Sequence, residues 1–129
     1  MVACQGNVLR VVVIGRAFHS YWKRPLERDQ IITTVARGSR IDKKWRRDLQ
    51  EKGIFQARSL CERSGINLAA MDFVFGMNDS DPQPLLLEIN YYFGRRGLGG
   101  SLKYYRHLHR AIREWIEKQG LDPGRVKLV

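Results

Sequence analysis

Hydrophobic and polar residues alternate along this chain with two different periods, and the changes of period mark its predicted strands and helices. Apolar, β-branched residues fill Val8–Gly15, and the loosely alternating Ala17–Lys23 follows after a short turn, which predicts a β-hairpin. Two further apolar runs, Leu68–Phe75 and Pro84–Ile89, flank the turn-forming residues 78–82 and predict a second hairpin. The sheet is therefore predicted to be mainly antiparallel.

Two longer segments carry apolar residues at helical spacing. The first predicted helix is Lys43–Arg63, with Asp42 as its N-cap, Gly65 just beyond its end and Gly53 as a position that could divide it. The second runs from Ser101, as its cap, to about Gln119. Its apolar residues share one face, which is predicted to pack in the core: Leu102, Tyr105, Leu108, Ile112, Trp115 and Ile116.

The order of these elements predicts an α+β fold. Residues 30–36 are expected to form a short strand or an extended loop, so the chain is predicted to run through strands, a helix, two strands and a second helix. This order predicts a mainly antiparallel sheet with the helices packed on one side of it. With 129 residues, 43% of them hydrophobic, residues 1–129 are expected to form a single domain with its own core.

Two carboxylates interrupt the apolar runs of the second hairpin. Asp72 lies in the first run, Glu88 lies in the second, and Asn90 follows two residues later on the same face of the strand. A hairpin brings such residues together, and their oxygens suit a hard cation such as Mg²⁺ or Mn²⁺. The alternative is that these acids are interior residues paired with some of the many arginines, because a buried carboxylate needs a compensating charge.

The sequence Glu88-Ile89-Asn90, with Asp72 on the preceding strand and a Gly-rich loop at residues 91–100, resembles the Mg-ATP site of the ATP-grasp ligases. The nearest branch contains glutathione synthetase and the ribosomal-protein glutamate ligases. The resemblance extends from about Val8 to Ile116, and it implies the carboxy-terminal subdomain of the ATP-grasp fold.

The resemblance also implies an activity and roles for particular residues. Asp72, Glu88 and Asn90 are expected to hold magnesium between the phosphates of ATP, with Arg10 and Asn90 contacting the nucleotide. Arg10 and Arg37 are expected to act in catalysis by stabilising the transferred phosphoryl group. The implied reaction is ATP-dependent ligation of a carboxylate to an amine or thiol through an acyl phosphate. From the residues alone, Arg10 could equally lie at a sheet edge and Arg37 in a solvated loop.

An ATP-grasp enzyme holds ATP between two subdomains, and no segment of residues 1–129 resembles the amino-terminal one. The chain is therefore expected to be inactive without the remaining subdomain as a partner. One alternative is a non-catalytic module that binds metal or nucleotide, or that forms a homodimer through bare strand edges. Another is a basic nucleic-acid-binding domain.

The net charge of +10, from 23 basic and 13 acidic residues, must be explained. Basic residues cluster at 40–47 and 95–113, which fits a solvated surface, a nucleic-acid interface or a site for a small polyanion such as ATP. The absence of a nucleic-acid motif with aromatic platforms argues against nucleic acid. His107 and His109 are two residues apart and so cannot share a helix face, and His19 receives no role.

The remaining features concern location. No apolar run is long enough to span a bilayer, so no membrane partner is expected. Cys4 and Cys61 have no metal-ligand spacing, and they are predicted to be free thiols of a cytoplasmic protein.

Overall fold

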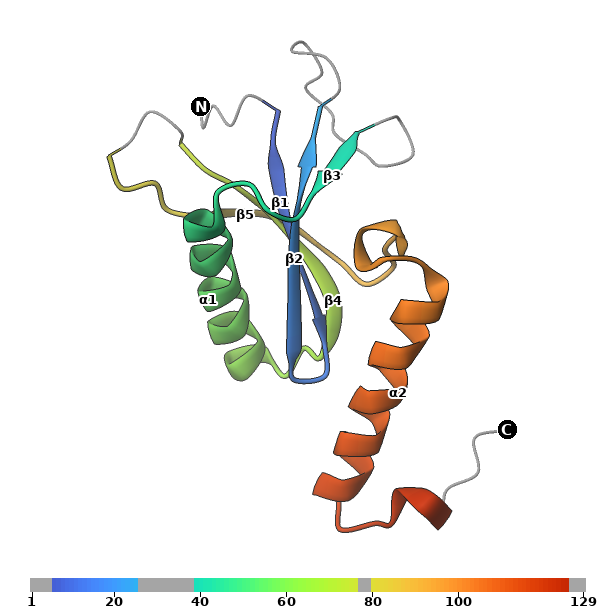
Figure 1. Ribbon diagram of the computed structural model, residues 1–129. Coiled ribbons are helices and arrows are strands. Elements are labelled where there is room, and N and C mark those ends of the chain that lie inside the picture. The colour runs from blue at the N-terminus through green and yellow to red at the C-terminus, as the bar shows by residue number, and fades with distance from the viewer. Residues whose placement is uncertain (1–5, 26–38, 77–79, 126–129) are drawn as a thin grey trace.

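The structure is a computed structural model that describes residues 6–25, 39–76 and 80–125 (Figure 1). Its main elements, in chain order, are β1 (Val8–Ile14), β2 (Ala17–Arg24), β3 (Arg40–Asp42), α1 (Arg47–Ser64), β4 (Leu68–Val74), β5 (Leu85–Asn90) and α2 (Ser101–Lys118). Two short 3-10 helices, η2 (Arg96–Leu98) and η3 (Pro123–Arg125), flank α2. Residues 30–36 and Arg37 lie outside the described residues, so their predicted conformation and role stay predictions.

The described strands form one five-stranded sheet in the order β3-β2-β1-β4-β5, and every neighbouring pair is antiparallel. The predicted α+β class is confirmed. Both predicted hairpins are present, because Ile14 pairs with Ala17 across the first turn and Asp72 pairs with Glu88 in the second. The two carboxylates therefore lie side by side across β4 and β5, as the sequence predicted.

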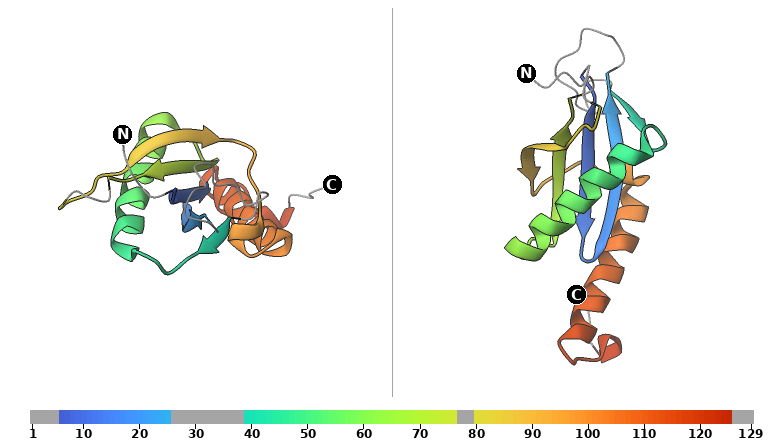
Figure 2. Two further views of the ribbon diagram at one scale, coloured as in Figure 1. Left: turned by 90° about the horizontal axis from the view of Figure 1, so that it is seen from above. Right: turned by 90° about the vertical axis from the view of Figure 1, so that its left-hand side faces the viewer.

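The two helices cover opposite faces of the sheet, so the prediction that they pack on one side was wrong (Figure 2). Leu9, Val11 and Val13 of β1 face the cluster that contains α1, whereas Val12 and Ile14 face the cluster that contains α2. The physical reason is that the central strands are apolar on both faces, and each apolar face must be removed from water.

Helix α1 begins at Arg47, four residues later than predicted. Asp42 does cap backbone groups, but those of a separate turn: its Oδ1 accepts the N–H groups of Lys44 and Trp45 at 2.9 and 3.0 Å. Arg46 then adopts a left-handed conformation with φ 43°, so the turn does not continue directly into the helix. Asp42 is therefore not the cap of α1.

Helix α1 passes through Gly53 without a break. A Cβ at this position would overlap Leu9 Cδ2 and would lie 3.5 Å from Val11 Cγ2. Gly53 thus permits the close approach of α1 to β1. At the far end, Gly65 has φ 79° and donates its N–H to the Cys61 carbonyl, which confirms the predicted helix end.

Helix α2 is only partly covered by the sheet. Its cap position is Gly100 rather than Ser101, and no side chain caps it. Ile116 is buried, but Leu102, Tyr105 and Trp115 are 65, 51 and 57% exposed, so the prediction that this whole face packs in the core was wrong. The α2 residues that pack on the sheet near its start are Tyr104, Leu108 and Ala111, so the buried face is turned away from Leu102 and Tyr105. The far end of α2 continues past the strands (Figure 1).

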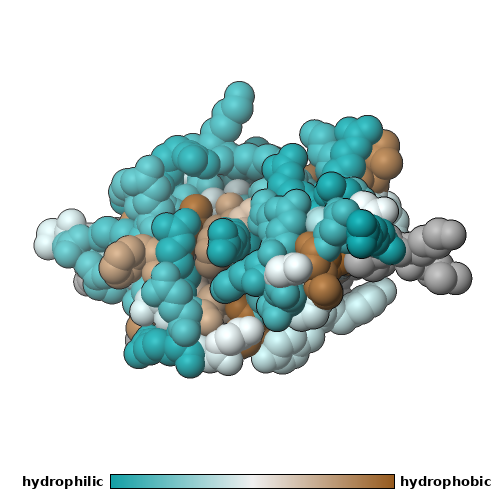
Figure 3. All heavy atoms as spheres, turned by 90° about the horizontal axis from the view of Figure 1, so that it is seen from below, coloured by the Kyte–Doolittle hydropathy of each residue, from teal (hydrophilic) through white to brown (hydrophobic). Residues whose placement is uncertain are grey.

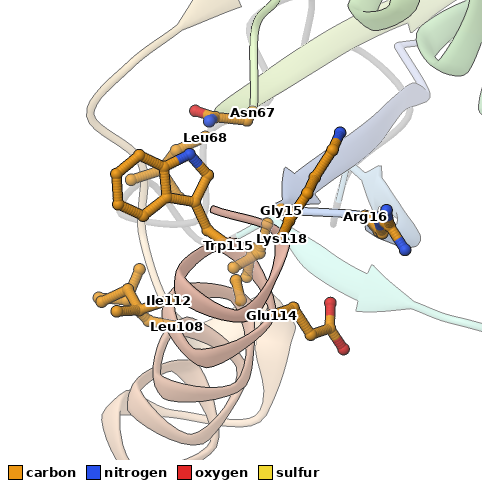
Figure 4. Close-up of a pocket in the computed structure, with 11 residues that line it drawn as sticks. Gly15, Arg16, Asn67, Leu68, Leu108, Ile112, Glu114, Trp115 and Lys118 are labelled. Carbon is orange, nitrogen blue, oxygen red and sulfur yellow. The ribbon is translucent and has the colours of Figure 1, made fainter. Parts of the chain in front are cut away.

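The uncovered part of α2 borders an apolar groove of about 390 Å³ beside the β1–β2 turn (Figure 4). Leu68, Leu108, Ile112 and Trp115 are among its lining residues. Viewed from below, apolar residues are open to solvent between hydrophilic side chains (Figure 3). Within the described ranges, no helix is both long and apolar enough to cross a membrane.

Candidate functional site

Charged side chains from four strands lie on the sheet face toward α2, near the end of the sheet where the Gly-rich loop begins. Arg10 of β1 is paired in register with Tyr21 on one side and with Asp72 of β4 on the other. Glu88 of β5 is the next residue across from Asp72. The strand alternation therefore places the sequence-predicted Arg10, Asp72 and Glu88 in one row across the sheet.

Asp72 is the centre of a buried ion cluster. Arg10 donates to it through Nε and Nη2, at 2.8 Å to Oδ1 and 2.9 Å to Oδ2. Lys23 of β2 adds a bond from Nζ to Oδ2 at 2.9 Å. Asp72 and Lys23 are only 2 and 6% exposed, so this cluster is largely withdrawn from solvent. The ion-pair alternative drawn from the sequence therefore describes Asp72 well.

The cluster shifts the ionisation of its members. Burial by itself raises the pKa of Asp72, but the hydrogen bonds and charges of Arg10 and Lys23 outweigh burial and hold that pKa below its usual value. Burial lowers the pKa of Arg10, and the bonds and charge of Asp72 raise it by more. Burial raises the pKa of the neighbouring Tyr21. Arg10 and Asp72 are therefore charged at neutral pH, with a neutral phenol beside them.

Glu88 and Asn90 form the open side of the site. Glu88 is exposed, and its Oε1 accepts a hydrogen bond from Asn90 Nδ2 at 3.1 Å. Both residues line a pocket of about 290 Å³, together with Arg10, Lys23 and Arg96 of η2. The pocket therefore places three cations close to a solvent-accessible carboxylate and an amide.

A bulge in β5 turns Glu88 onto this face. Phe73 pairs with Leu86, whereas the adjacent Asp72 pairs with Glu88, so Leu87 is an extra residue in the strand. After the bulge, Glu88 and Asn90 share the face of Asp72 and Arg10. Strict alternation would place Glu88 on the same face as Leu86. The bulge, which the sequence pattern does not mark, therefore decides the direction of the Glu88 side chain.

The side-chain oxygens of Asp72, Glu88 and Asn90 are compatible with a hard cation, but Arg10 and Lys23 compete with a cation for the Asp72 carboxylate. Carboxylate and amide oxygens suit Mg²⁺ or Mn²⁺. Asp72 uses three of its roughly four lone-pair positions on Arg10 and Lys23, so it could offer one more. No group of three or more His, Cys, Asp or Glu side chains able to hold a metal occurs among the described residues. Glu88 is therefore the most accessible ligand in the set.

Arg95 does not take part in this pocket. Its guanidinium stacks on the rings of Tyr104 and Tyr105, at 4.7 and 4.8 Å from their centroids, and Nη1 donates to the Tyr105 hydroxyl at 2.7 Å. The neighbouring Arg96 lines the pocket instead. Only one of the two arginines in the Gly-rich loop is therefore directed toward the candidate site.

Sequence reasoning missed Lys23, although the signal was present. A two-residue turn at 15–16 fixes the hairpin register, and period-two alternation then places Lys23 on the face of Arg10. Arg96 carried no comparable signal, because its direction depends on the short helix η2.

Comparison with models of known protein families gives no match to this chain, and comparison with curated proteins gives no significant match.

Proposed function

We propose that this chain carries the metal- and phosphate-binding face of an ATP-dependent carboxylate–amine (or thiol) ligase of the ATP-grasp type. One observation supports this best. Arg10, Asp72, Glu88 and Asn90, which come from three different strands, lie on one sheet face beside the loop at residues 91–100. In the proposed enzyme, ATP phosphorylates a carboxylate, and an amine or thiol then displaces phosphate from the acyl phosphate.

Arg10 is the proposed phosphate ligand. A guanidinium has five N–H bonds, and Asp72 accepts from only two of its donor atoms, Nε and Nη2. The Tyr21 hydroxyl is a further hydrogen-bond partner of the guanidinium. The N–H bonds that Asp72 and Tyr21 leave unused would bind phosphoryl oxygens and stabilise their developing charge. Asp72 acts here as a positioning residue, because it fixes Arg10 and Lys23 at the pocket wall.

Glu88 and Asn90 are the proposed metal ligands on the open side, with Asp72 behind them. A bound Mg²⁺ or Mn²⁺ would supply charge neutralisation at the phosphates. The chain's own residues would orient the nucleotide through Arg10, Lys23 and Arg96, which surround the same pocket. The ATP-grasp interpretation also requires a second subdomain to cover the nucleotide during catalysis.

The test is isothermal titration calorimetry of the chain with Mg-ATP, compared with Glu88→Gln. Glu88 is exposed, so its substitution removes a ligand charge without disturbing the core. We expect binding that depends on magnesium and that weakens about tenfold or more in Glu88→Gln, because one carboxylate ligand is lost. The matched control is Glu62→Gln, an exposed acid of α1 on the far side of the sheet, which should bind as wild type.

Equal affinity in wild type and Glu88→Gln would contradict the metal role of Glu88. A wild-type chain that shows no magnesium-dependent binding would contradict the proposal for this chain.

A further inference from the structure

A second, strongly basic pocket lies along the part of β2 that has β1 on one side and no described strand on the other. β3 pairs only with Trp22–Arg24, so within the described sheet the first half of β2 borders a hollow rather than a second neighbouring strand. The hollow has a volume of about 590 Å³, and its walls come from β2, the start of α1, η2 and α2. Of these elements, α2 lies on the same side of the sheet as β3 in Figure 1.

Five cationic side chains line this pocket, and no Asp or Glu does. The five are Lys43, Arg47, Lys103, Arg106 and Arg110. None of them takes part in an ion pair among residues 6–25, 39–76 and 80–125. This contrasts with Lys23, Arg24 and Lys52, each of which has an acidic partner. Like charges gathered in a concave site create a positive potential that attracts anions.

Two histidines stand together in the same pocket. The rings of His19 and His107 have their centroids 4.2 Å apart. His19 Nε2 is shielded from solvent and has no hydrogen-bond partner within the described part of the chain. Burial, followed by His107, Lys43 and Arg110, lowers the pKa of His19, so this ring is neutral at pH 7. A buried ring nitrogen without a partner, among five cations, indicates a site that a ligand would complete.

We propose that this pocket binds a compact polyanion of the phosphate class. Two helices and the turn before α1 place their cations around one hollow, which suits a short ligand with several charges, such as a polyphosphate. A nucleic-acid duplex would instead require an extended basic stripe that follows its backbone. The site is separate from the proposed nucleotide site, because Tyr21 and Gly97 form a wall shared by the two pockets.

The probe for this site is inorganic tripolyphosphate, titrated calorimetrically into the chain in EDTA, so that no metal-dependent nucleotide site contributes. We expect binding by wild type and a loss of about tenfold or more in the double variant Arg106→Ala/Arg110→Ala, because two charge-assisted contacts are removed. Both arginines are exposed, so the variant should fold. The matched control is Arg113→Ala, an exposed arginine of α2 that does not line this pocket.

The outcomes separate this proposal from the proposed ligase activity. Glu88→Gln should retain tripolyphosphate binding even though it weakens Mg-ATP. No binding by wild type, or an equal loss in Arg113→Ala, would overturn the proposal. If a single-stranded oligonucleotide bound more tightly than tripolyphosphate and was weakened by the same double substitution, the surface would be a nucleic-acid interface instead.

A pH series gives a second, independent readout. An anion bound beside the neutral His19 would raise its pKa, so binding would take up a proton and strengthen as the pH falls from about 8 to about 6. The charged groups around His19 are all basic, so no acid within the lining offsets this effect. We expect His19→Gln to show a shallower pH dependence than wild type with the same probe. Identical pH profiles would contradict a role for this histidine in binding.

Discussion

Asp72 shows how one buried acid can organise the charges around it. Its carboxylate is 2% exposed and is bonded to Arg10 and Lys23, which come from two other strands. Buried pairs of this kind add little net stability when compared with apolar residues of the same size. Their removal is costly, however, because the partner charges stay buried without compensation.

We therefore expect Asp72→Asn to lower the free energy of unfolding by about 3–5 kcal/mol, because Arg10 and Lys23 would be left buried and unpaired. Urea denaturation measures the loss. The control is Asp48→Asn, which breaks the exposed pair with Arg46 and should cost less than about 1 kcal/mol. Equal losses in the two variants would mean that burial of the ion cluster carries no special cost.

The same residue predicts a pH dependence of stability. The pKa of Asp72 is lower in the folded chain than in the unfolded chain, so its contribution is fully present above roughly pH 4 and is lost as the pH falls through the folded value. Between pH 5 and pH 2, wild type should therefore lose more stability than Asp72→Asn. Parallel acid profiles would argue against this linkage.

At the scale of elements, Gly53 explains why α1 can lie so close to the sheet. Its missing side chain leaves room for Leu9, the first core residue of β1. From sequence alone, a glycine within a helical pattern indicates a break, because glycine is a poor helix former. The contact that justifies it comes from a strand more than forty residues earlier and was not visible in the local pattern.

We expect Gly53→Ala to destabilise the protein by about 1–2 kcal/mol. Overpacking costs about 1–3 kcal/mol, and the better helix propensity of alanine returns at most about 1 kcal/mol. Thermal and urea unfolding measure the change, with the exposed Gln56→Ala as a helix control that should stay near wild type. A variant more stable than wild type would show that propensity outweighs packing here.

Local patterns predicted the elements better than their arrangement. The two hairpins followed from alternation and turn residues, and Gly65 correctly marked the end of α1. The prediction that Asp42 caps the first helix was wrong, because the same side chain can cap an isolated turn. The sheet face that each helix covers was also not predictable, since strands that are apolar on both faces give no preference.

In the candidate site, too, local contacts could be predicted from the sequence and those made by tertiary packing could not. Asp72 and Glu88 were expected side by side from the hairpin, and they are. The position of Arg10 beside Asp72 depends on the pairing of β1 with β4, which the local pattern does not give. Lys23 followed from the register of the first hairpin but was overlooked. The pairing of His19 with His107 joins β2 to α2, so only tertiary packing brings these rings together.

At the scale of the whole molecule, the two edge strands of the described sheet, β3 and β5, differ. β3 is short, whereas β5 presents three leucines, Leu85, Leu86 and Leu87, that are 49, 42 and 58% exposed. β5 is the outermost described strand on its side. An apolar edge strand offers unpaired backbone groups and apolar surface to another chain.

A homodimer through bare strand edges, one of the alternatives drawn from the sequence, can be tested at this edge. We expect concentration-dependent self-association in sedimentation equilibrium, and we expect Leu87→Lys to shift the chain toward monomer, because an edge lysine opposes strand pairing. Leu102→Lys replaces a leucine of α2 that is 65% exposed, against 58% for Leu87, and serves as the control. A wild-type chain that stays monomeric at all concentrations would reject pairing through β5.

The wall between the two pockets leaves no free space. The ring of Tyr21 lies against Gly97 so closely that a Cβ on that glycine would overlap it. A ligand that moves this ring from one side must therefore alter the space available on the other. Thermodynamic reciprocity then applies: whatever factor a polyanion imposes on nucleotide affinity, the nucleotide must impose on polyanion affinity. Through the Tyr21 ring, the apparent affinity of the chain for each ligand would then depend on the concentration of the other.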